Sequence, residues 1–94
     1  MSDKIILKYT MSASPGKVSI CMKTGQILDV QVQGEVIALW LCTTVSAKSK
    51  NVVFNKVWTG EIFEYNDKDR FLKTVQVGGY VVHIFILGVK PVTE

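Results

Sequence analysis

The chain has 94 residues, of which 48% are apolar and 20% charged, and its net charge is +3. This length allows one domain, residues 1–94, with one modest core, and excludes a separate cofactor-binding domain. The lysines are scattered and Arg70 is the only arginine, which argues against sequence-specific DNA recognition because arginine is the usual reader of guanine edges.

The first part of the chain predicts two strands. Residues 5–10 (IILKYT) alternate apolar and more polar side chains, which is typical of a half-buried strand. Residues 12–16 (SASPG) predict a turn, and residues 18–23 alternate again. We therefore expect the two strands to pair as a hairpin.

Residues 25–44 form the stretch around which the chain is organised, read as two strands joined by a tight turn at Gln33-Gly34. The first strand alternates strictly. Its apolar face carries Leu28, Val30 and Val32. Its opposite face carries Asp29, Gln31 and Gln33, and we expect that face to meet water or a polar pocket.

The second strand of this pair, residues 36–44, is apolar on both faces until Thr43. A strand of this kind needs cover on both sides, which predicts a place in the middle of a sheet. We expect Trp40 to be buried there, so that its replacement by alanine would unfold the domain.

The middle of the chain begins with a basic loop, residues 46–51 (SAKSKN). Residues 52–59 predict a strand that places Phe54 and Trp58 on the same side as Lys56. Residues 61–65 predict a short strand or strap, and residues 66–70 an exposed loop or a single helical turn.

The last part of the chain predicts a hairpin. Residues 71–77 read as a strand, with Phe71 on the same side as Val75, and Gly78-Gly79 is a strong two-residue turn signal. Residues 80–87 are apolar on both faces and predict a second central strand. We expect an ordered core of about residues 4–88, with 89–94 as a tail and Pro91 ending the sheet.

These elements predict an all-β domain, a small antiparallel sandwich or rolled barrel of about seven short strands. The two strands with two apolar faces need cover from a second sheet or from a second copy of the chain. We therefore expect self-association as a homodimer or higher oligomer.

Cys21 and Cys42 lie inside apolar strand patterns, and His83 is the only histidine. We see no signal peptide and no transmembrane run, so we expect a cytosolic protein without membrane contact, whose thiols are buried, reduced and unbridged. Two cysteines and one histidine do not make a structural zinc site, and we expect no metal or cofactor.

Several segments recur in the same order in a known group of sequences. They are Lys8-Tyr9, residues 20–22 (ICM), Gly25 with Ile27-Leu28, residues 30–33 (VQVQ), Trp40, Thr59-Gly60, residues 71–76, Gly78-Gly79 and residues 82–85 (VHIF). Their order resembles a family of short, uncharacterised proteins of tailed bacteriophages, and the resemblance covers residues 5–85. It implies a viral protein in the host bacterial cytoplasm and transfers no catalytic residues. The sequence departs from the family between Cys42 and Asn51, where an acidic, proline-containing loop is expected.

Six residues are candidates for a ligand site. They are His83, Tyr80, Trp58, Lys56, Gln31 and Gln33. Aromatic rings can stack on a base, amides can read its edge, and lysines near the loop 46–51 can hold a phosphate. Each also has a structural explanation: a histidine whose ring nitrogens bond to backbone or a hydroxyl, aromatic core residues, a hydrated sheet face and a solvated loop.

The sequence contains no phosphate-binding glycine loop and no order of nucleophile, histidine and acid, so we do not expect an enzyme. We expect a non-catalytic phage protein that acts against a host system, by sequestering a host immune signalling nucleotide or by gripping a host protein. The alternative is a virion or assembly accessory protein.

Overall fold

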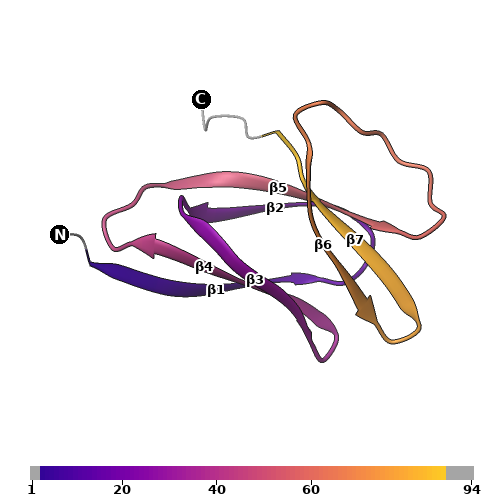
Figure 1. The fold of residues 1–94 in the computed structure, drawn as a ribbon, viewed down its shortest axis with the longest axis horizontal. Coiled ribbons are helices and arrows are strands. Elements are labelled where there is room, and N and C mark those ends of the chain that lie inside the picture. The colour runs from indigo at the N-terminus through magenta and orange to yellow at the C-terminus, as the bar shows by residue number, and fades with distance from the viewer. Residues whose placement is uncertain (1–2, 89–94) are drawn as a thin grey trace.

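The computed structural model describes residues 3–88 and contains seven antiparallel strands in two facing sheets (Figure 1). The strands are β1 Lys4–Ser12, β2 Gly16–Lys23, β3 Gln26–Gln33, β4 Val36–Thr44, β5 Ser49–Trp58, β6 Arg70–Val77 and β7 Tyr80–Ile86. The all-β class is confirmed, and of the two predicted architectures the structure is a sandwich. Pro91 and the predicted tail lie outside the described residues.

One sheet has the strand order β1-β4-β3 and the other β2-β5-β7-β6. Both predicted tight hairpins are present, β3–β4 and β6–β7. Gly34 and Gly78 open the two turns with positive φ angles of 65° and 59°, which glycine adopts without strain. The first turn lies at Gly34-Glu35, one residue beyond the prediction, because Gln33 still pairs with Val36.

The predicted hairpin of the first two strands is wrong. Strand β1 pairs with β4 along its whole length, and β2 pairs with β5. The turn signal in residues 12–16 is real, but the connection carries the chain from one sheet to the other. Because β1 and β2 lie in different sheets, each turns its apolar side toward the space between the sheets. A hairpin of these two strands would place both in one sheet.

The core lies between the sheets. It consists of Met11, Met22, Val30, Ile37, Leu39, Leu41, Val52, Phe54, Val75, Val82 and Ile84. Strands β4 and β7 supply it from central positions, as predicted, because each has a hydrogen-bonded neighbour on both sides. Burial of this shared layer is the main stabilising contribution available to the domain.

The outer face of β7 is covered by residues 59–69, which we call the strap. Phe63 and Tyr65 pack on Phe85, with ring centroids 5.1 and 5.8 Å apart. The segment 61–65 is a strap and not a strand. It supplies from within one chain the second cover that β7 requires.

The end of the strap is fixed by Asp69, which is buried although residues 66–70 were predicted to be exposed. Its carboxylate oxygens accept hydrogen bonds from the backbone amides of Asn66 at 2.9 Å and Gly88 at 3.2 Å. Its carbonyl oxygen accepts one from the Tyr65 hydroxyl at 3.0 Å. These bonds satisfy a buried carboxylate and join the strap to the end of β7.

Three side chains predicted to be buried are not. Both thiols are free, as expected, but Cys21 is exposed and Cys42 half-buried. Cys42 and Trp40 lie on the outer face of β4, where Trp40 is half-buried with the Lys8 ammonium 5.8 Å from its ring centroid. The inner face of β4 is occupied by Ile37, Leu39 and Leu41, which alternate with these residues. An apolar residue in this strand is therefore not always a core residue.

A β-bulge interrupts β3 between Ile27 and Asp29, and another interrupts β6 between Phe71 and Lys73. Each bulge reverses the side on which the preceding residues point. Leu28 is therefore exposed while Val30 is buried, and Phe71 is exposed while Val75 is buried. The predicted grouping of each pair on one face is wrong for this reason.

Candidate functional site

A groove of about 370 Å³ lies at one end of the sandwich. Three connections meet there: the link from β1 to β2, the β3–β4 turn and the β6–β7 turn. The groove is lined by Ser12, Ala13, Ser14, Glu35, Trp58, Val77, Tyr80 and Val82. Hydroxyls, one carboxylate and two large aromatic rings thus border the same space.

The aromatic part of the groove is a stacked pair. The rings of Trp58 and Tyr80 have centroids 5.0 Å apart and planes 11° from parallel, and both side chains are exposed. Trp58 ends β5, where its amide donates to the Glu61 carboxylate at 2.9 Å. Tyr80 begins β7 directly after the two-residue turn. The pair forms a flat apolar platform that can accept a planar ring or an aliphatic side chain.

Lys56 lies on the same face of β5 as Trp58 but does not line the groove. Its side chain is only 4% exposed, and its ammonium donates to the Ser12 carbonyl oxygen at 2.6 Å. Burial lowers the Lys56 pKa from its ordinary value, because the charged form loses hydration. Lys56 therefore fixes the link between β1 and β2. It lies at the opposite end of β5 from Lys50, so these two lysines do not form one phosphate site.

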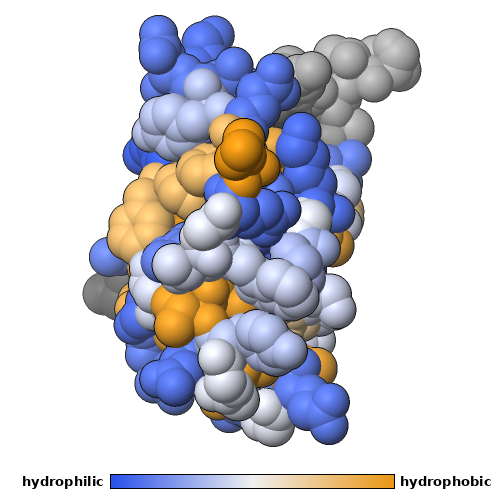
Figure 2. Space-filling model, turned by 90° about the vertical axis from the view of Figure 1, so that its right-hand side faces the viewer, coloured by the Kyte–Doolittle hydropathy of each residue, from blue (hydrophilic) through white to orange (hydrophobic). Residues whose placement is uncertain are grey.

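A second candidate surface lies on the strap. Four aromatic rings contact one another there, those of Phe63, Tyr65, Phe71 and Phe85. Ile62, which precedes Phe63 in the chain, is 96% exposed. We call these five residues the strap surface. Figure 2 shows apolar residues gathered on the side of the molecule that carries the strap. Clusters of exposed aromatic rings are typical of protein-binding surfaces.

His83 belongs to neither candidate surface. Its Nε2 lies 2.7 Å from the Thr59 hydroxyl, and its Nδ1 lies 2.9 Å from the Thr74 hydroxyl. Both ring nitrogens are thus satisfied by hydroxyl groups, which was the structural explanation given above. The hydroxyls fix the ring against β6 and the start of the strap.

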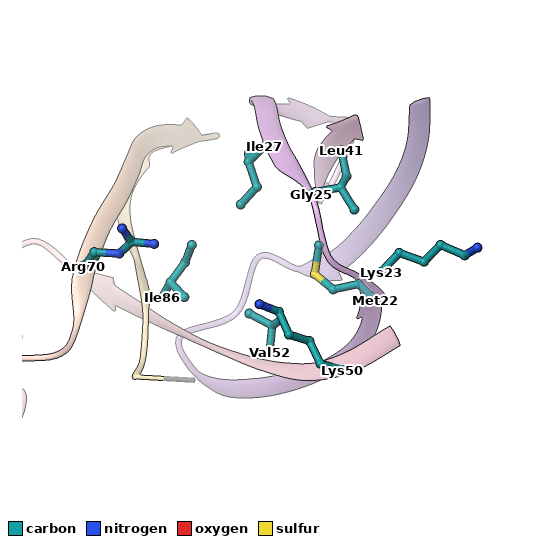
Figure 3. Close-up of a pocket in the computed structure, with 9 residues that line it drawn as sticks. All are labelled: Met22, Lys23, Gly25, Ile27, Leu41, Lys50, Val52, Arg70 and Ile86. Carbon is teal, nitrogen blue, oxygen red and sulfur yellow. The ribbon is translucent and has the colours of Figure 1, made fainter. Parts of the chain in front are cut away.

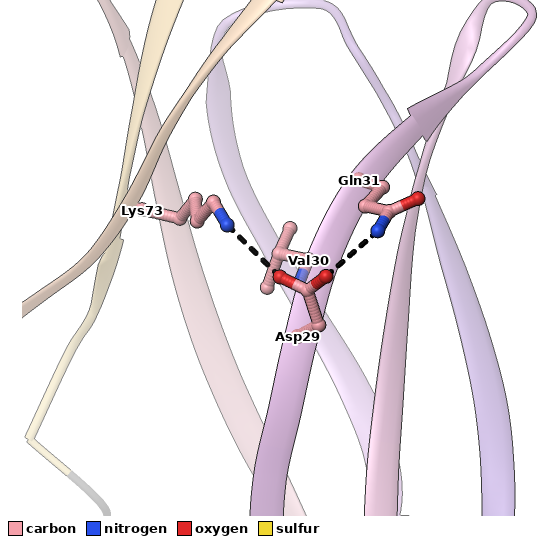
Figure 4. A network of polar contacts seen from close by, with 4 residues as sticks. All are labelled: Asp29, Val30, Gln31 and Lys73. Atoms are coloured by element: carbon pink, nitrogen blue, oxygen red, sulfur yellow. Dashed lines mark hydrogen bonds and ion pairs between the residues drawn. The ribbon is translucent and has the colours of Figure 1, made fainter.

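Gln31 and Gln33 lie on the exposed outer face of the other sheet, as the alternation in residues 27–33 predicts. Gln31 donates its side-chain amide to the Asp29 carboxylate at 2.7 Å. The other Asp29 oxygen accepts from the Lys73 ammonium at 2.9 Å (Figure 4). This ion pair connects β3 to β6 across the edge of the sandwich. Asp29 and Lys73 each directly follow a bulge, and the bulge sets the direction in which the side chain points.

The Asp29 carboxylate provides a pH prediction. The hydrogen bond from Lys73 lowers its pKa from 3.8 to about 2, with help from Gln31 and the Val30 amide. A lowered pKa means that the pair stabilises the fold above about pH 4 and that this contribution disappears as the pH falls toward 2. We expect Lys73→Gln to raise the Asp29 pKa toward 3.8 in an NMR titration of the carboxyl group.

The control is Lys68→Gln, which removes an exposed lysine from the strap without touching Asp29. It should leave the Asp29 titration unchanged. Because both members of the Asp29–Lys73 pair are partly exposed, we expect only a small loss of stability at neutral pH. An Asp29 pKa that stays near 2 in Lys73→Gln would contradict the assigned cause.

The six predicted site residues therefore separate into four places. Trp58 and Tyr80 meet, and Lys56 is buried against the Ser12 carbonyl oxygen. His83 lies on the outer face of β7 in one sheet, and Gln31 and Gln33 lie on the outer face of β3 in the other. Sequence reasoning missed the groove residues Ser12, Ser14 and Glu35. It also missed that Phe71 contacts Phe85 as part of the strap surface. The turn signals near residues 12–16 and 33–34 were the available indication, but only the strand order shows that these turns meet.

Comparison of the chain with protein-family models, with curated proteins and with solved structures found no match. Residues 3–88 contain no helix long and apolar enough to span a membrane. In the same part of the chain, no group of three or more histidine, cysteine, aspartate or glutamate residues is placed to hold a metal ion.

Proposed function

We propose that the protein is a non-catalytic binding protein of a tailed phage that grips a host protein through the strap surface. The observation that carries the proposal is the exposure of Ile62, which precedes Phe63 in the chain, together with four aromatic rings that are linked through Phe85. Aromatic side chains are enriched at the cores of protein interfaces, where a few buried residues carry most of the binding energy. The resemblance to short phage proteins supplies the setting, a bacterial cytoplasm during infection.

The strap surface is also well built for this task. Phe85 anchors it to a central strand, and Asp69 closes its end with hydrogen bonds to Asn66 and Gly88. A surface that is ordered before binding loses less conformational entropy when a partner docks. The entropy lost by the exposed rings when a partner docks is therefore small.

Sequestration of a signalling nucleotide is the second candidate, and the stacked pair of Trp58 and Tyr80 favours it. A base could lie on this platform, with the hydroxyls of Ser12 and Ser14 near its ribose. The charge of the groove is less suitable, because Glu35 is the charged residue that lines it and Lys56 is committed to Ser12. A phosphate group there would meet a carboxylate instead of a cation.

The test is a pair of matched substitutions, Ile62→Asp on the strap surface and Ile6→Asp on the exposed face of β1. Each variant is expressed in a phage-sensitive bacterium, and co-purifying proteins are quantified by mass spectrometry. We expect one host protein to be retained by the wild type and by Ile6→Asp, and to fall by about tenfold or more with Ile62→Asp.

Native mass spectrometry of the same preparations separates the alternatives. A bound nucleotide that Trp58→Ala removes would favour sequestration and contradict the protein-binding proposal. A mass of two or more chains that Ile62→Asp reduces to one would show that the strap surface serves self-association. An unchanged set of partners for all variants would refute the role of the strap surface.

A further inference from the structure

A second cavity lies at the opposite end of the sandwich from the groove, between the two sheets (Figure 3). Its volume is about 100 Å³. Apolar side chains from both sheets line it: Met22, Ile27, Leu41, Val52 and Ile86. The cavity is thus an opening into the edge of the hydrophobic core, and an aliphatic group placed in it would contact core residues on several sides.

Two cations stand at this cavity. The guanidinium of Arg70 and the ammonium of Lys50 both extend toward it, from β6 and from β5 (Figure 3). Lys23 extends away and donates to the Val45 carbonyl oxygen at 2.6 Å. Within residues 3–88 the Lys73–Asp29 contact is the sole ion pair, so neither Arg70 nor Lys50 has a carboxylate partner there.

A groove of about 360 Å³ adjoins the cavity and shares Gly25, Ile27, Arg70 and Ile86 with it. The groove follows the starts of β3 and β6, which are edge strands of their sheets. Both strands carry their bulge at this point, and a bulge bends a strand and ends regular pairing. The cavity is therefore open to an extended chain that enters between the two sheets.

We propose that this cavity binds the carboxyl-terminal residue of a peptide chain that ends in an aliphatic amino acid. The side chain enters the cavity, and the terminal carboxylate lies between Arg70 and Lys50. The preceding residues leave along the groove between β3 and β6. Arginine suits this role because its planar fork pairs with both oxygens of a carboxylate.

The size of the cavity selects the ligand. A cavity of about 150 Å³ holds a benzene ring, so the smaller cavity here is matched to a branched aliphatic group and excludes a nucleobase. The cavity shares no lining residue with the strap surface, and the adjoining groove shares Phe71 with it. The proposal does not depend on the function proposed above, because it is argued from the cavity and its two cations.

The test is an NMR titration of backbone amides with the peptide N-acetyl-Gly-Ala-Leu. We expect shifts of the Met22, Val52 and Ile86 amides, and about tenfold weaker binding for the same peptide with an amidated end, which lacks the charge. Equal binding of the acid and the amide, or no shift at millimolar peptide, would refute the site. Octanoate that binds as tightly as the peptide would refute the peptide part of the proposal.

Arg70→Gln supplies the matched variant. Arg70 is exposed at the start of β6, so the substitution leaves the core intact. We expect it to weaken the acid peptide about tenfold and to leave the amidated peptide unchanged. Lys17→Gln removes an exposed charge from β2 away from the cavity and should bind like the wild type. Unchanged affinity in Arg70→Gln would overturn the proposed carboxylate contact.

Discussion

Phe54→Ala is expected to lower the free energy of unfolding by about 3–5 kcal/mol, the usual cost of removing a buried aromatic ring. Phe54 lies in β5 and is 0% exposed, among the largest fully buried side chains. Its ring faces the layer between the two sheets, where no solvent can fill the space that it leaves. The loss is a large part of the roughly 5–15 kcal/mol that stabilises a domain.

Urea unfolding followed by circular dichroism measures this loss. Phe71→Ala is the control, because Phe71 is 57% exposed on the outer face of the same sheet. We expect it to cost about 1 kcal/mol or less. Trp40→Ala should also cost less than Phe54→Ala, since Trp40 lies half-buried on an outer face. Equal losses for Phe54→Ala and Phe71→Ala would contradict the assignment of inner and outer faces.

Gly25→Ala is expected to destabilise the fold by about 3 kcal/mol, the upper end of the usual range for overpacking. A β-carbon on Gly25 would collide with the Cys42 carbonyl oxygen and lie 3.0 Å from the Thr43 β-carbon. A backbone oxygen cannot rotate out of the way. The buried Thr43 hydroxyl also donates to the Thr24 carbonyl oxygen, so the chain at residues 24–25 is held against β4.

Gly79→Ala is the matched substitution. A β-carbon there would meet no atom within 4 Å, and Gly79 does not have a positive φ angle. We expect a change close to zero, which thermal melting of both variants would show. Similar melting temperatures for the two variants would mean that the link between β2 and β3 can move away from β4.

The sequence allowed the strands to be located well, because their signals are local. The alternation in residues 27–33 and the apolar run of residues 36–44 depend on neighbours within one strand. The pairing of β1 with β4 and of β2 with β5 could not be read in this way. A turn signal such as Pro15-Gly16 is the same for a hairpin and for a crossing between sheets.

The errors in facing direction have one physical origin. A strand period of two residues predicts facing only while the pairing is regular, and a bulge adds a residue that shifts the period. Leu28 and Phe71 are exposed for this reason. Apolar composition did not signal the bulges, because leucine occupies an outward position as readily as an inward one when a neighbour offers partial cover.

The candidate site was predictable only in part. Trp58 and Tyr80 were expected to share a ligand, and the structure brings their rings together because β5 and β7 are neighbours. His83 does not join them, because its side chain lies on the outer face of β7 and contacts the Thr59 hydroxyl. The strap surface was not foreseen, since it depends on residues 59–69 folding back over β7.

The interleaved pairing of the two sheets has a consequence for the order of folding. The hairpins β3–β4 and β6–β7 close through two-residue turns, whereas β1 and β2 must find partners far along the chain, which is slow because closing a long loop costs entropy. We expect pulsed hydrogen exchange to show protection in β4 and β7 before β1 and β2. A nascent chain therefore displays two unpaired N-terminal strands until β4 has been made, and β2 stays unpaired until β5 follows.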